Sequence, residues 1–564
     1  MSAPHLTERW RLLRLTAKLG RPGKRGRSMS RLGLRKPARP VDAFLLVPSD
    51  LRTPDPGVAT EFRQGEVEFA GETVRFGRQS PFRVAGAGPF WQNELQGFGW
   101  LRDLAAANDL EMARQLVAEW LEHCSPPDGR AWTPEIVSRR IVSLLSQAGF
   151  LLEDAETQFF GAVTSSLALQ MQVLAATHRR ARPGLPHLQC LLAMLLADLT
   201  IADRDEPRES SEKLVLAEIG SQILPDGGHV SRNPRVLLEL LLDLLPLRRC
   251  YAAREMETPP ALDKAMQQML LHLRTMRLGD GTLGRFNGMG LVRADELSTV
   301  LAFDSISSPL PRELPASGYV RFERGQTVML MDCGSPPPLE LAGQAQAGCL
   351  SFEMSDGPRA ILVNCGYPGS GRSLERPVAR ATASHNTLSL NGQSSSRFVT
   401  SRSIQRLCGD AVLAGPAQVS FRFMEHNGSH AFEAWHDGYA QASQLVHTRR
   451  LEVSPDGSRL DGQDRLGPRR GVLRLGRDLP FAIHFHLAPG IGAAMDSLAG
   501  NRFVTLNVAD GPGWRLSAAG ADIEIAASHR YGTTAPGQPS LQILLRATCP
   551  GEATVIWTLE RHSD

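Results

Sequence analysis

The chain has 564 residues, of which 42% are hydrophobic and 21% are charged, and its formal net charge at pH 7 is +3. This composition is typical of a folded globular protein and excludes a disordered or fibrous chain. The length predicts two or three domains, because a single hydrophobic core does not grow to this size. The small net charge gives no support for nucleic-acid binding by the whole molecule.

The first forty residues depart from this charge balance. They contain twelve lysines and arginines against one acidic residue, Glu8, which predicts a flexible, solvated basic tail over residues 1–40. A second interpretation is that the stretch RWRLLRLTAKLG forms a short amphipathic helix that contacts an anionic membrane surface. The tail lacks the apolar segment and cleavage site of a secretory signal, so we expect a cytoplasmic location, with the periplasm or cell envelope as the alternative.

The eight cysteines are scattered along the chain and form no C-x-x-C pair. This spacing argues against a disulfide framework and against a zinc site built from thiolates, and it favours a reducing compartment. The most apolar stretch, LQCLLAMLLADLTIAD, is interrupted by polar residues and fits a buried helix better than a membrane span.

The region after the tail is predicted to be helical, with one exception at its start. Residues 41–90 form a short mixed segment in which GEVEFAGETVRFG predicts a small hairpin. Residues 91–305 show apolar positions three and four apart, and Thr133 followed by Pro134 is a typical helix start. A series of antiparallel helical hairpins of this length predicts an incomplete α/α toroid.

Near Phe303 the apolar spacing changes from a helical to a strand period. Short alternating or apolar runs follow, separated at regular intervals by turns rich in Gly, Pro, Asp and Asn. Residues 306–564 are therefore predicted to form a large antiparallel β-sandwich. The fold class expected for the chain is α+β and multidomain, with the toroid first and the sandwich second.

Several short stretches carry a more specific signal through their order and spacing. They are WTPEIVSRRIVSLL, ILPDGGHVSRNP, GRFNGMG, QAQAGCLSFEMSDG, ILVNCGYPG, RATASHNTLSLNG and AWHDGYAQASQLVHTRRLEV. Together they resemble the heparinase II/III family of polysaccharide lyases over nearly all of the chain after the tail. The resemblance implies β-elimination on an acidic, uronate-containing oligo- or polysaccharide. In that reaction a donor neutralises the sugar carboxylate, a base removes the C5 proton and an acid protonates the leaving oxygen.

The family's catalytic residues are only partly retained. In relatives these roles belong to an Asn-His pair on an inner helix, a Tyr after the DGG turn and the first His of an H-x-H motif. The matching positions here are Pro186-His187, Val236 and Gln344. Of this catalytic set, His187 is the ionisable residue that the resemblance carries over.

The family's zinc ligands are also replaced. In relatives the second His of the H-x-H motif, an Asp of the next strand and the His of HNT hold a structural zinc. The matching residues are Gln346, Asn364 and His385, and amide side chains are poor zinc ligands. We predict no cofactor and a metal-free Gln/Asn/His hydrogen-bond network with a structural His385; zinc binding is the other interpretation.

Other polar residues near the matched turn can supply the missing chemistry. A histidine titrates near neutrality and can act as a base, and an arginine can hold a uronate carboxylate by two parallel hydrogen bonds. The catalytic candidates are His187, His229 and Arg232. The substrate-binding candidates are Arg235, Asn287 and Gln344. In the simpler interpretation of each, the histidine caps backbone and the arginine forms a local ion pair.

Two functions of different class remain open at this stage. The first is a lyase that uses His187 with non-standard partners, for which Tyr251 and Tyr367 are the nearest replacement acids. The second is a non-catalytic relative that binds a glycan or glycan precursor, and loss of the Tyr and the sandwich His favours it. Apolar packing around Val236 would argue against the enzyme. Glu94, at the head of the first toroid helix, is interpreted as structural.

Overall fold

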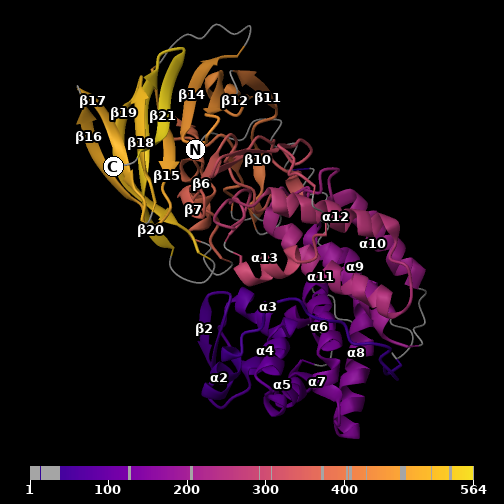
Figure 1. Cartoon of the computed structure of the whole chain (residues 1–564). Coiled ribbons are helices and arrows are strands. Elements are labelled where there is room, and N and C mark those ends of the chain that lie inside the picture. The colour runs from indigo at the N-terminus through magenta and orange to yellow at the C-terminus, as the bar shows by residue number, and fades with distance from the viewer. Residues whose placement is uncertain are drawn as a thin grey trace.

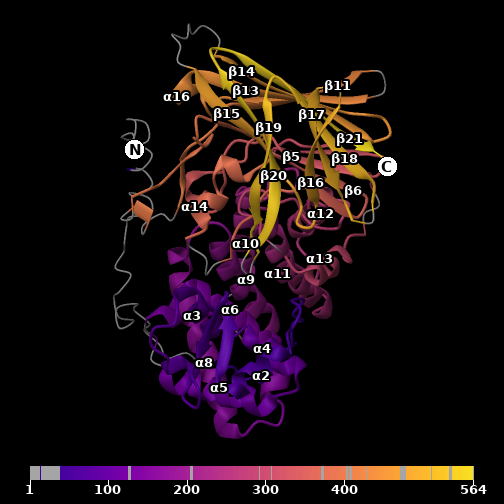
Figure 2. The same ribbon diagram turned by 90° about the vertical axis from the view of Figure 1, so that its left-hand side faces the viewer.

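The fold is taken from a computed structural model of the chain (Figure 1). It describes residues 13, 39–124, 127, 129–202, 208–290, 292–305, 308–369, 374–401, 404–405, 410–426, 429–469, 478–498, 500–509, 511–532 and 537–562. Helices form one body and strands form another, and the two meet along one seam (Figures 1 and 2). The basic tail of the sequence lies almost entirely outside the described residues, so its predicted roles stay predictions.

The helical body contains helices of up to 21 residues. They are α2 (Gly57–Gln64), α3 (Pro89–Gly97), α4 (Trp100–Ala106), α5 (Leu110–His123), α6 (Pro134–Ser146), α7 (Ala148–Leu152), α8 (Thr157–Thr177), α9 (Leu185–Thr200), α10 (Arg208–Gln222), α11 (Pro234–Ala253), α12 (Pro260–Thr275) and α13 (Ala294–Leu301). The predicted hairpin is confirmed, because β1 (Glu66–Phe69) pairs with β2 (Glu72–Arg75) in antiparallel register.

Local sequence explains where several of these helices begin. The Asp109 side chain accepts the Met112 N–H at the start of α5, and the Asn233 side chain accepts the Arg235 N–H at the start of α11. Thr133 occupies the predicted cap position of α6, but its hydroxyl donates to the Arg130 carbonyl at 3.1 Å and accepts no helix N–H. Proline in the first turn therefore marks this start better than the threonine cap.

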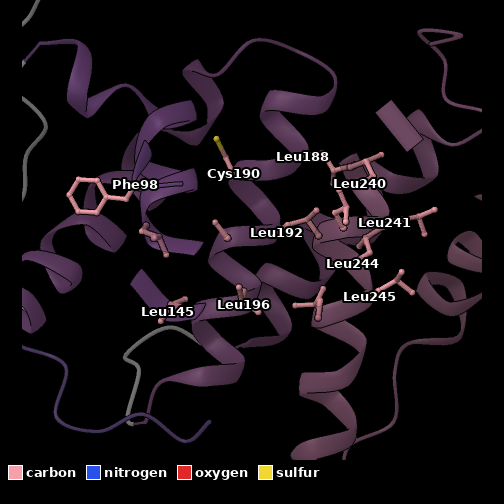
Figure 3. Packing of buried hydrophobic residues seen from close by; sticks show 14 of the residues in the cluster. Phe98, Leu145, Leu188, Cys190, Leu192, Leu196, Leu240, Leu241, Leu244 and Leu245 are labelled. Carbon is pink, nitrogen blue, oxygen red and sulfur yellow. The ribbon is translucent and has the colours of Figure 1, made fainter. Parts of the chain in front are cut away.

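Leucines of α9 and α11 fill the centre of the helical body (Figure 3). Leu188, Leu192 and Leu196 of α9 are at most 5% exposed, as are Leu240 and Leu244 of α11. Both helices are apolar on several faces because neighbours cover them on several sides. Among the described residues one helix, Thr157–Arg180, is long and apolar enough to span a membrane by length and composition, a test that core helices also pass.

The strand body consists of antiparallel sheets. A five-stranded sheet has the order β3 (Glu313–Leu314), β4 (Tyr319–Arg324), β5 (Thr327–Asp332), β6 (Phe352–Asp356) and β7 (Arg359–Leu362). An eight-stranded sheet has the order β11 (Val419–His426), β12 (Ser429–His436), β13 (Leu445–Val453), β14 (Arg459–Pro468), β21 (Ala553–His562), β18 (Gly513–Ala519), β17 (Asn501–Asn507) and β16 (Gly492–Leu498). A four-stranded sheet has the order β19 (Asp522–Arg530), β20 (Gln538–Cys549), β15 (Leu479–His486) and β8 (Leu388–Leu390).

Short elements complete the sandwich. The strands β9 (Arg397–Phe398) and β10 (Val412–Ala414) pair with each other, and α14 (Arg376–Ala379) and α16 (Ala440–Ser443) are single helical turns. The predicted fold class, an α+β chain of helices followed by a β-sandwich, is confirmed.

The five-stranded sheet takes part in two hydrophobic cores. Val328 and Leu330 of β5 belong to the core of the helical body, whereas Met329 and Met331 belong to the core of the sandwich. Successive side chains of a strand point to opposite faces, so β5 is buried on both sides. This sheet therefore joins the two bodies as a shared layer.

Candidate functional site

The turn before α11, which carries two of the catalytic candidates, is part of a buried polar joint between the two bodies. Arg232 has a backbone φ of +59° and its side chain is 7% exposed. Its guanidinium donates to four backbone carbonyls and one carboxylate. The acceptors are Ser317, Gly318, Gly334, Ser335 and Asp332. A guanidinium has five N–H groups, so Arg232 keeps no donor for a substrate and holds a structural position in place of the predicted catalytic one.

Asn287 belongs to the same joint. Its Nδ2 donates to Asp332 Oδ2 at 2.9 Å and to Tyr319 Oη at 3.0 Å, and the Tyr319 hydroxyl donates to the Arg232 carbonyl. Burial raises the pKa of Tyr319, which keeps its proton on this bond. Asn287 is 3% exposed, so the predicted contact between its amide and a substrate does not fit its surroundings.

His229 is held on both ring nitrogens. Its Nδ1 accepts the Ser231 N–H at 3.0 Å, and its Nε2 lies 2.8 Å from Gln222 Oε1. The Gln222 amide nitrogen donates to Glu218, so the oxygen faces the ring and the Nε2 atom carries the proton. Burial lowers the pKa of His229 to about 4. A neutral imidazole whose two ring nitrogens are both hydrogen-bonded has no free lone pair for the predicted role of base.

The space around this turn is filled. The hollow has a cavity volume of about 0 Å³, and its lining is His229, Arg232, Asn233, Pro234, Leu237, His272, Ser317 and Tyr319. Val236, at the position matched to the family's tyrosine, is 8% exposed and belongs to the helical core. Apolar packing at this position is the condition that argues against the predicted enzyme.

His187 lies in a different setting at the start of α9. Its Nδ1 is 3.1 Å from Glu218 Oε1, and its Nε2 is 3.4 Å from His178 Nδ1. The two imidazoles are stacked with ring centroids 5.6 Å apart. The His187 side chain is 22% exposed. A carboxylate that orients a partly exposed imidazole is the usual geometry of a general base, so His187 is the one catalytic candidate of the three whose surroundings fit proton transfer.

The two candidate replacement acids are engaged elsewhere. The Tyr251 hydroxyl donates to Glu212 Oε2 at 2.7 Å inside the helical body, and burial raises the pKa of Tyr251. Tyr367 is 7% exposed, and burial also raises the pKa of its phenol. In the described part of the chain neither tyrosine contacts His187, so no tyrosine there serves as an acid beside the candidate base.

The three residues matched to the zinc ligands each bind protein backbone. Gln346 accepts the Gly288 N–H and donates to the Gly366 and Ala379 carbonyls. Asn364 Oδ1 accepts the Asn386 N–H at 2.9 Å. His385 Nδ1 donates to the Ala381 carbonyl at 2.8 Å.

These hydrogen bonds correct the predicted Gln/Asn/His network, and they also bear on whether the three residues could bind zinc. The three side chains form no shared network, because each holds a separate backbone segment. His385 Nε2 is buried and has no hydrogen-bond partner in the part of the chain that the structure describes, and burial lowers the pKa of His385 to about 4. Two engaged amides and one imidazole do not fit a zinc ion, which prefers thiolate, imidazole or carboxylate ligands.

A cluster of arginines and carboxylates lines the inner side of the helical body. Its members come from the segment before α2 and from α3, α4, α6, α11 and α13. They are Asp50, Arg52, Glu94, Arg102, Arg139, Arg235, Glu239, Asp243 and Glu296. Its charges largely neutralise one another: Arg235 Nη2 is 3.5 Å from Glu239 Oε1, and Arg52 Nη2 is 2.8 Å from Asp243 Oδ1.

The pKa of each carboxyl group in this cluster depends on the balance between its burial and the nearby arginines. Burial opposes the ionised form of Glu239, yet Arg52, Arg139 and Arg235 lower its pKa to about 2. Protein atoms crowd the Glu94 carboxyl and this loss of water raises its pKa, although the residue keeps contact with solvent. The adjoining cavity of about 20 Å³ has room for one water molecule.

Comparison with known proteins identifies the C-terminal domain. Residues 285–558 match the family model described as Heparinase II/III-like, C-terminal. The chain therefore carries a heparinase II/III-like C-terminal domain. It is 28% identical over 493 residues to FtsZ-localized protein C of Caulobacter vibrioides (strain NA1000 / CB15N), a match that covers 86% of this chain and 84% of that protein.

Solved heparinase structures share the fold of this chain. The heparan sulfate lyase HepC mutant from Pedobacter heparinus matches with a TM-score of 0.61 and 16% identity, over 99% of this chain and 88% of that chain. Heparinase III matches with a TM-score of 0.67 and 13% identity, over 86% of this chain and 80% of that chain. At these identities the likeness shows the fold alone.

The sequence analysis did not predict the charged cluster of the helical body. Glu94 was interpreted as structural, although it lies with Arg139 and Glu239 in the cluster. The available signal was Glu239 and Asp243, two carboxylates four residues apart in the otherwise apolar run 236–247 of α11. Such a spacing places both on one face of a helix, which then needs positive partners. Gln344, the last substrate-binding candidate, is exposed and accepts from Asn233 Nδ2 at 3.1 Å.

Proposed function

We propose that this chain acts by binding, not by cleaving a glycan, and that it works together with FtsZ. The observation that carries the first part is the filled polar joint at the turn before α11. There, the N–H groups of the Arg232 guanidinium bind protein acceptors. The cavity volume beside this turn is about 0 Å³, so no ligand fits there.

The chemistry of β-elimination supports the same proposal. The reaction needs an acid for the leaving oxygen and a donor for the sugar carboxylate. Val236 and Gln344 replace the two proton-exchanging side chains, and neither can donate and recover a proton. Arg235, the remaining candidate for the carboxylate, has Glu239 as an ion-pair partner at 3.5 Å. An acidic polymer would compete with this internal carboxylate for the arginine.

The FtsZ part of the proposal rests on the relative named FtsZ-localized protein C. The similarity runs over 86% of this chain and 84% of that protein, so it includes both the helical and the sandwich parts. FtsZ is a cytoplasmic protein, which agrees with the expected cytoplasmic location. Contact of residues 1–40 with an anionic membrane adds to this proposal and does not depend on it.

A pelleting assay tests the association. The purified chain is mixed with FtsZ assembled with GTP, and the polymer is collected by centrifugation. We expect the chain to sediment with the polymer and to stay in the supernatant when GTP is replaced by GDP. Equal amounts in the supernatant under both conditions would overturn the FtsZ part. Anionic vesicles with and without deletion of residues 1–40 test the tail, and unchanged vesicle binding would exclude it.

A lyase remains the second candidate function because of one observation, the His187–Glu218 pair at 3.1 Å. The test is a panel of uronate polymers and oligomers followed by the ultraviolet absorbance of the unsaturated sugar product. The binding proposal expects a flat trace throughout. Absorbance that rises with the wild-type chain and is lost in both His187→Ala and Glu218→Gln would replace it with a lyase of non-standard acid and base.

A further inference from the structure

Two arginines from distant parts of the chain, Arg285 and Arg530, lie near each other at the seam, outside the charged cluster; burial and the charge of Arg530 lower the pKa of Arg285 to about 10. Arg285 precedes α13, and Arg530 ends β19 in the four-stranded sheet. Arg285 and the residue that follows Arg530 both lie next to Gly366. A Cβ atom placed on this glycine would be 3.5 Å from Arg285 Cδ and 3.7 Å from the carbonyl oxygen of that following residue, Tyr531. Tyr531 is itself fixed there by donating its N–H to the Cys365 carbonyl at 2.8 Å.

The Arg285 guanidinium lacks a counter-charge in contact. Arg285 is 3% exposed, and its Nη1 atom is buried with no hydrogen-bond partner among the described residues. Among the described residues, no carboxylate oxygen lies within 4 Å of the guanidinium of Arg285 or of Arg530. By contrast, Arg232 pairs with Asp332 and Arg561 pairs with Asp356. Burying a charged donor without a partner is costly, so a missing anion is the simplest way to complete this site.

The carboxylates that act on the pair are already engaged. Glu353 accepts the Arg285 N–H at 2.9 Å and the Asn364 N–H at 2.7 Å, one on each oxygen. Asp280 Oδ1 accepts both the N–H and the hydroxyl of Thr282. Burial also raises the pKa of Glu353 to about 7, so it supplies only part of a negative charge near neutral pH.

We propose that Arg285 and Arg530 form a binding site for a small oxyanion at the seam between the helical body and the sandwich. Guanidinium groups match the oxygen geometry of phosphate, sulfate and carboxylate, and two of them can share one anion. Arg530 is half-buried, so the pair is reached from its side. The bound anion joins a segment next to α13 to the end of β19, and it stabilises the contact between the two bodies. This site does not depend on the proposed role with FtsZ.

Thermal unfolding of the full chain tests the site. The probes are sodium phosphate, sodium sulfate and sodium glucuronate, each compared with sodium chloride at equal ionic strength. We expect at least one oxyanion to raise Tm with a saturable dependence on concentration, and the strongest of the three identifies whether the site prefers a tetrahedral anion or a carboxylate. Equal Tm changes in all four salts would overturn the proposal.

Variants assign the effect to the pair. Arg530→Gln should weaken the apparent Kd by about tenfold or more, because it removes a charge-assisted contact. Arg502→Gln, an exposed arginine of β17 in the same sandwich, is the matched control and should keep the wild-type response. Arg530→Glu places a carboxylate beside Arg285, so its Tm in chloride should equal or exceed that of the wild type, with no further rise from oxyanions. An oxyanion response that persists in Arg530→Gln and Arg530→Glu would contradict the site.

Discussion

Replacing Arg232 by alanine should strongly destabilise the chain. The side chains of Arg232 and Asp332 are 7% and 4% exposed, and the arginine supplies the donors for four carbonyls of the sandwich. Removing one partner of a buried ion pair typically costs about 3 to 5 kcal/mol. Asp332 would keep the Asn287 amide and the Gly334 N–H as donors, so we expect about 3 kcal/mol from the pair and more from the unpaired carbonyls.

The assay is urea unfolding followed by tryptophan fluorescence, with the first cooperative transition compared between variants. Arg235→Ala is the matched control, because its side chain is 43% exposed and Glu239 keeps Arg52 and Arg139 as partners, so the loss should cost at most about 1 kcal/mol. Arg232→Lys should lie between the two, since an ammonium keeps the charge but has fewer donors. If Arg232→Ala unfolds within about 1 kcal/mol of Arg235→Ala, the polar joint is not what holds the two bodies together.

Three further outcomes are expected. Burial lowers the pKa of both His229 and His385 to about 4. On acidification the two histidines therefore take up protons in the unfolded chain before they do so in the folded chain. The free energy of unfolding should fall as pH drops from about 6.5 to about 4, by up to about 3 kcal/mol for each histidine. His385→Asn should flatten this dependence in urea titrations at several pH values; an unchanged pH profile would show that His385 does not titrate in this range. Dialysis against zinc followed by metal analysis should leave less than one bound zinc per chain, and a chelator should leave Tm unchanged; stoichiometric zinc would contradict the assignment of Gln346 and Asn364.

The order of the fold could be predicted because its signals are local. The hairpin over residues 65–77, the helix start at Pro134 and the change of period near Phe303 each depend on residues close in sequence. The positions matched to the family's zinc ligands followed from motif spacing. The claim that their side chains form one network was wrong, because the backbone groups they bind, such as the Ala381 carbonyl, are set by the tertiary fold.

The polar joint could not be predicted, because its contacts join residues far apart in the chain. Arg232 is 85 residues from Ser317 and 103 residues from Ser335, and both carbonyls accept from its guanidinium. The sequence around Arg232 is basic and polar, a pattern that fits a substrate site as well as an interface. Burial decides between the two, and periodicity over a single turn carries no information on burial.

The shared sheet limits how this protein can evolve and how it can be divided. A chain cut near residue 306 would keep all strands of the sandwich but would bare the face of the five-stranded sheet that carries Leu314, Tyr319, Val328 and Leu330. An exposed apolar sheet face invites aggregation. The two halves are therefore not interchangeable modules. A recombined relative would have to inherit the sheet and the helices that cover it as one block.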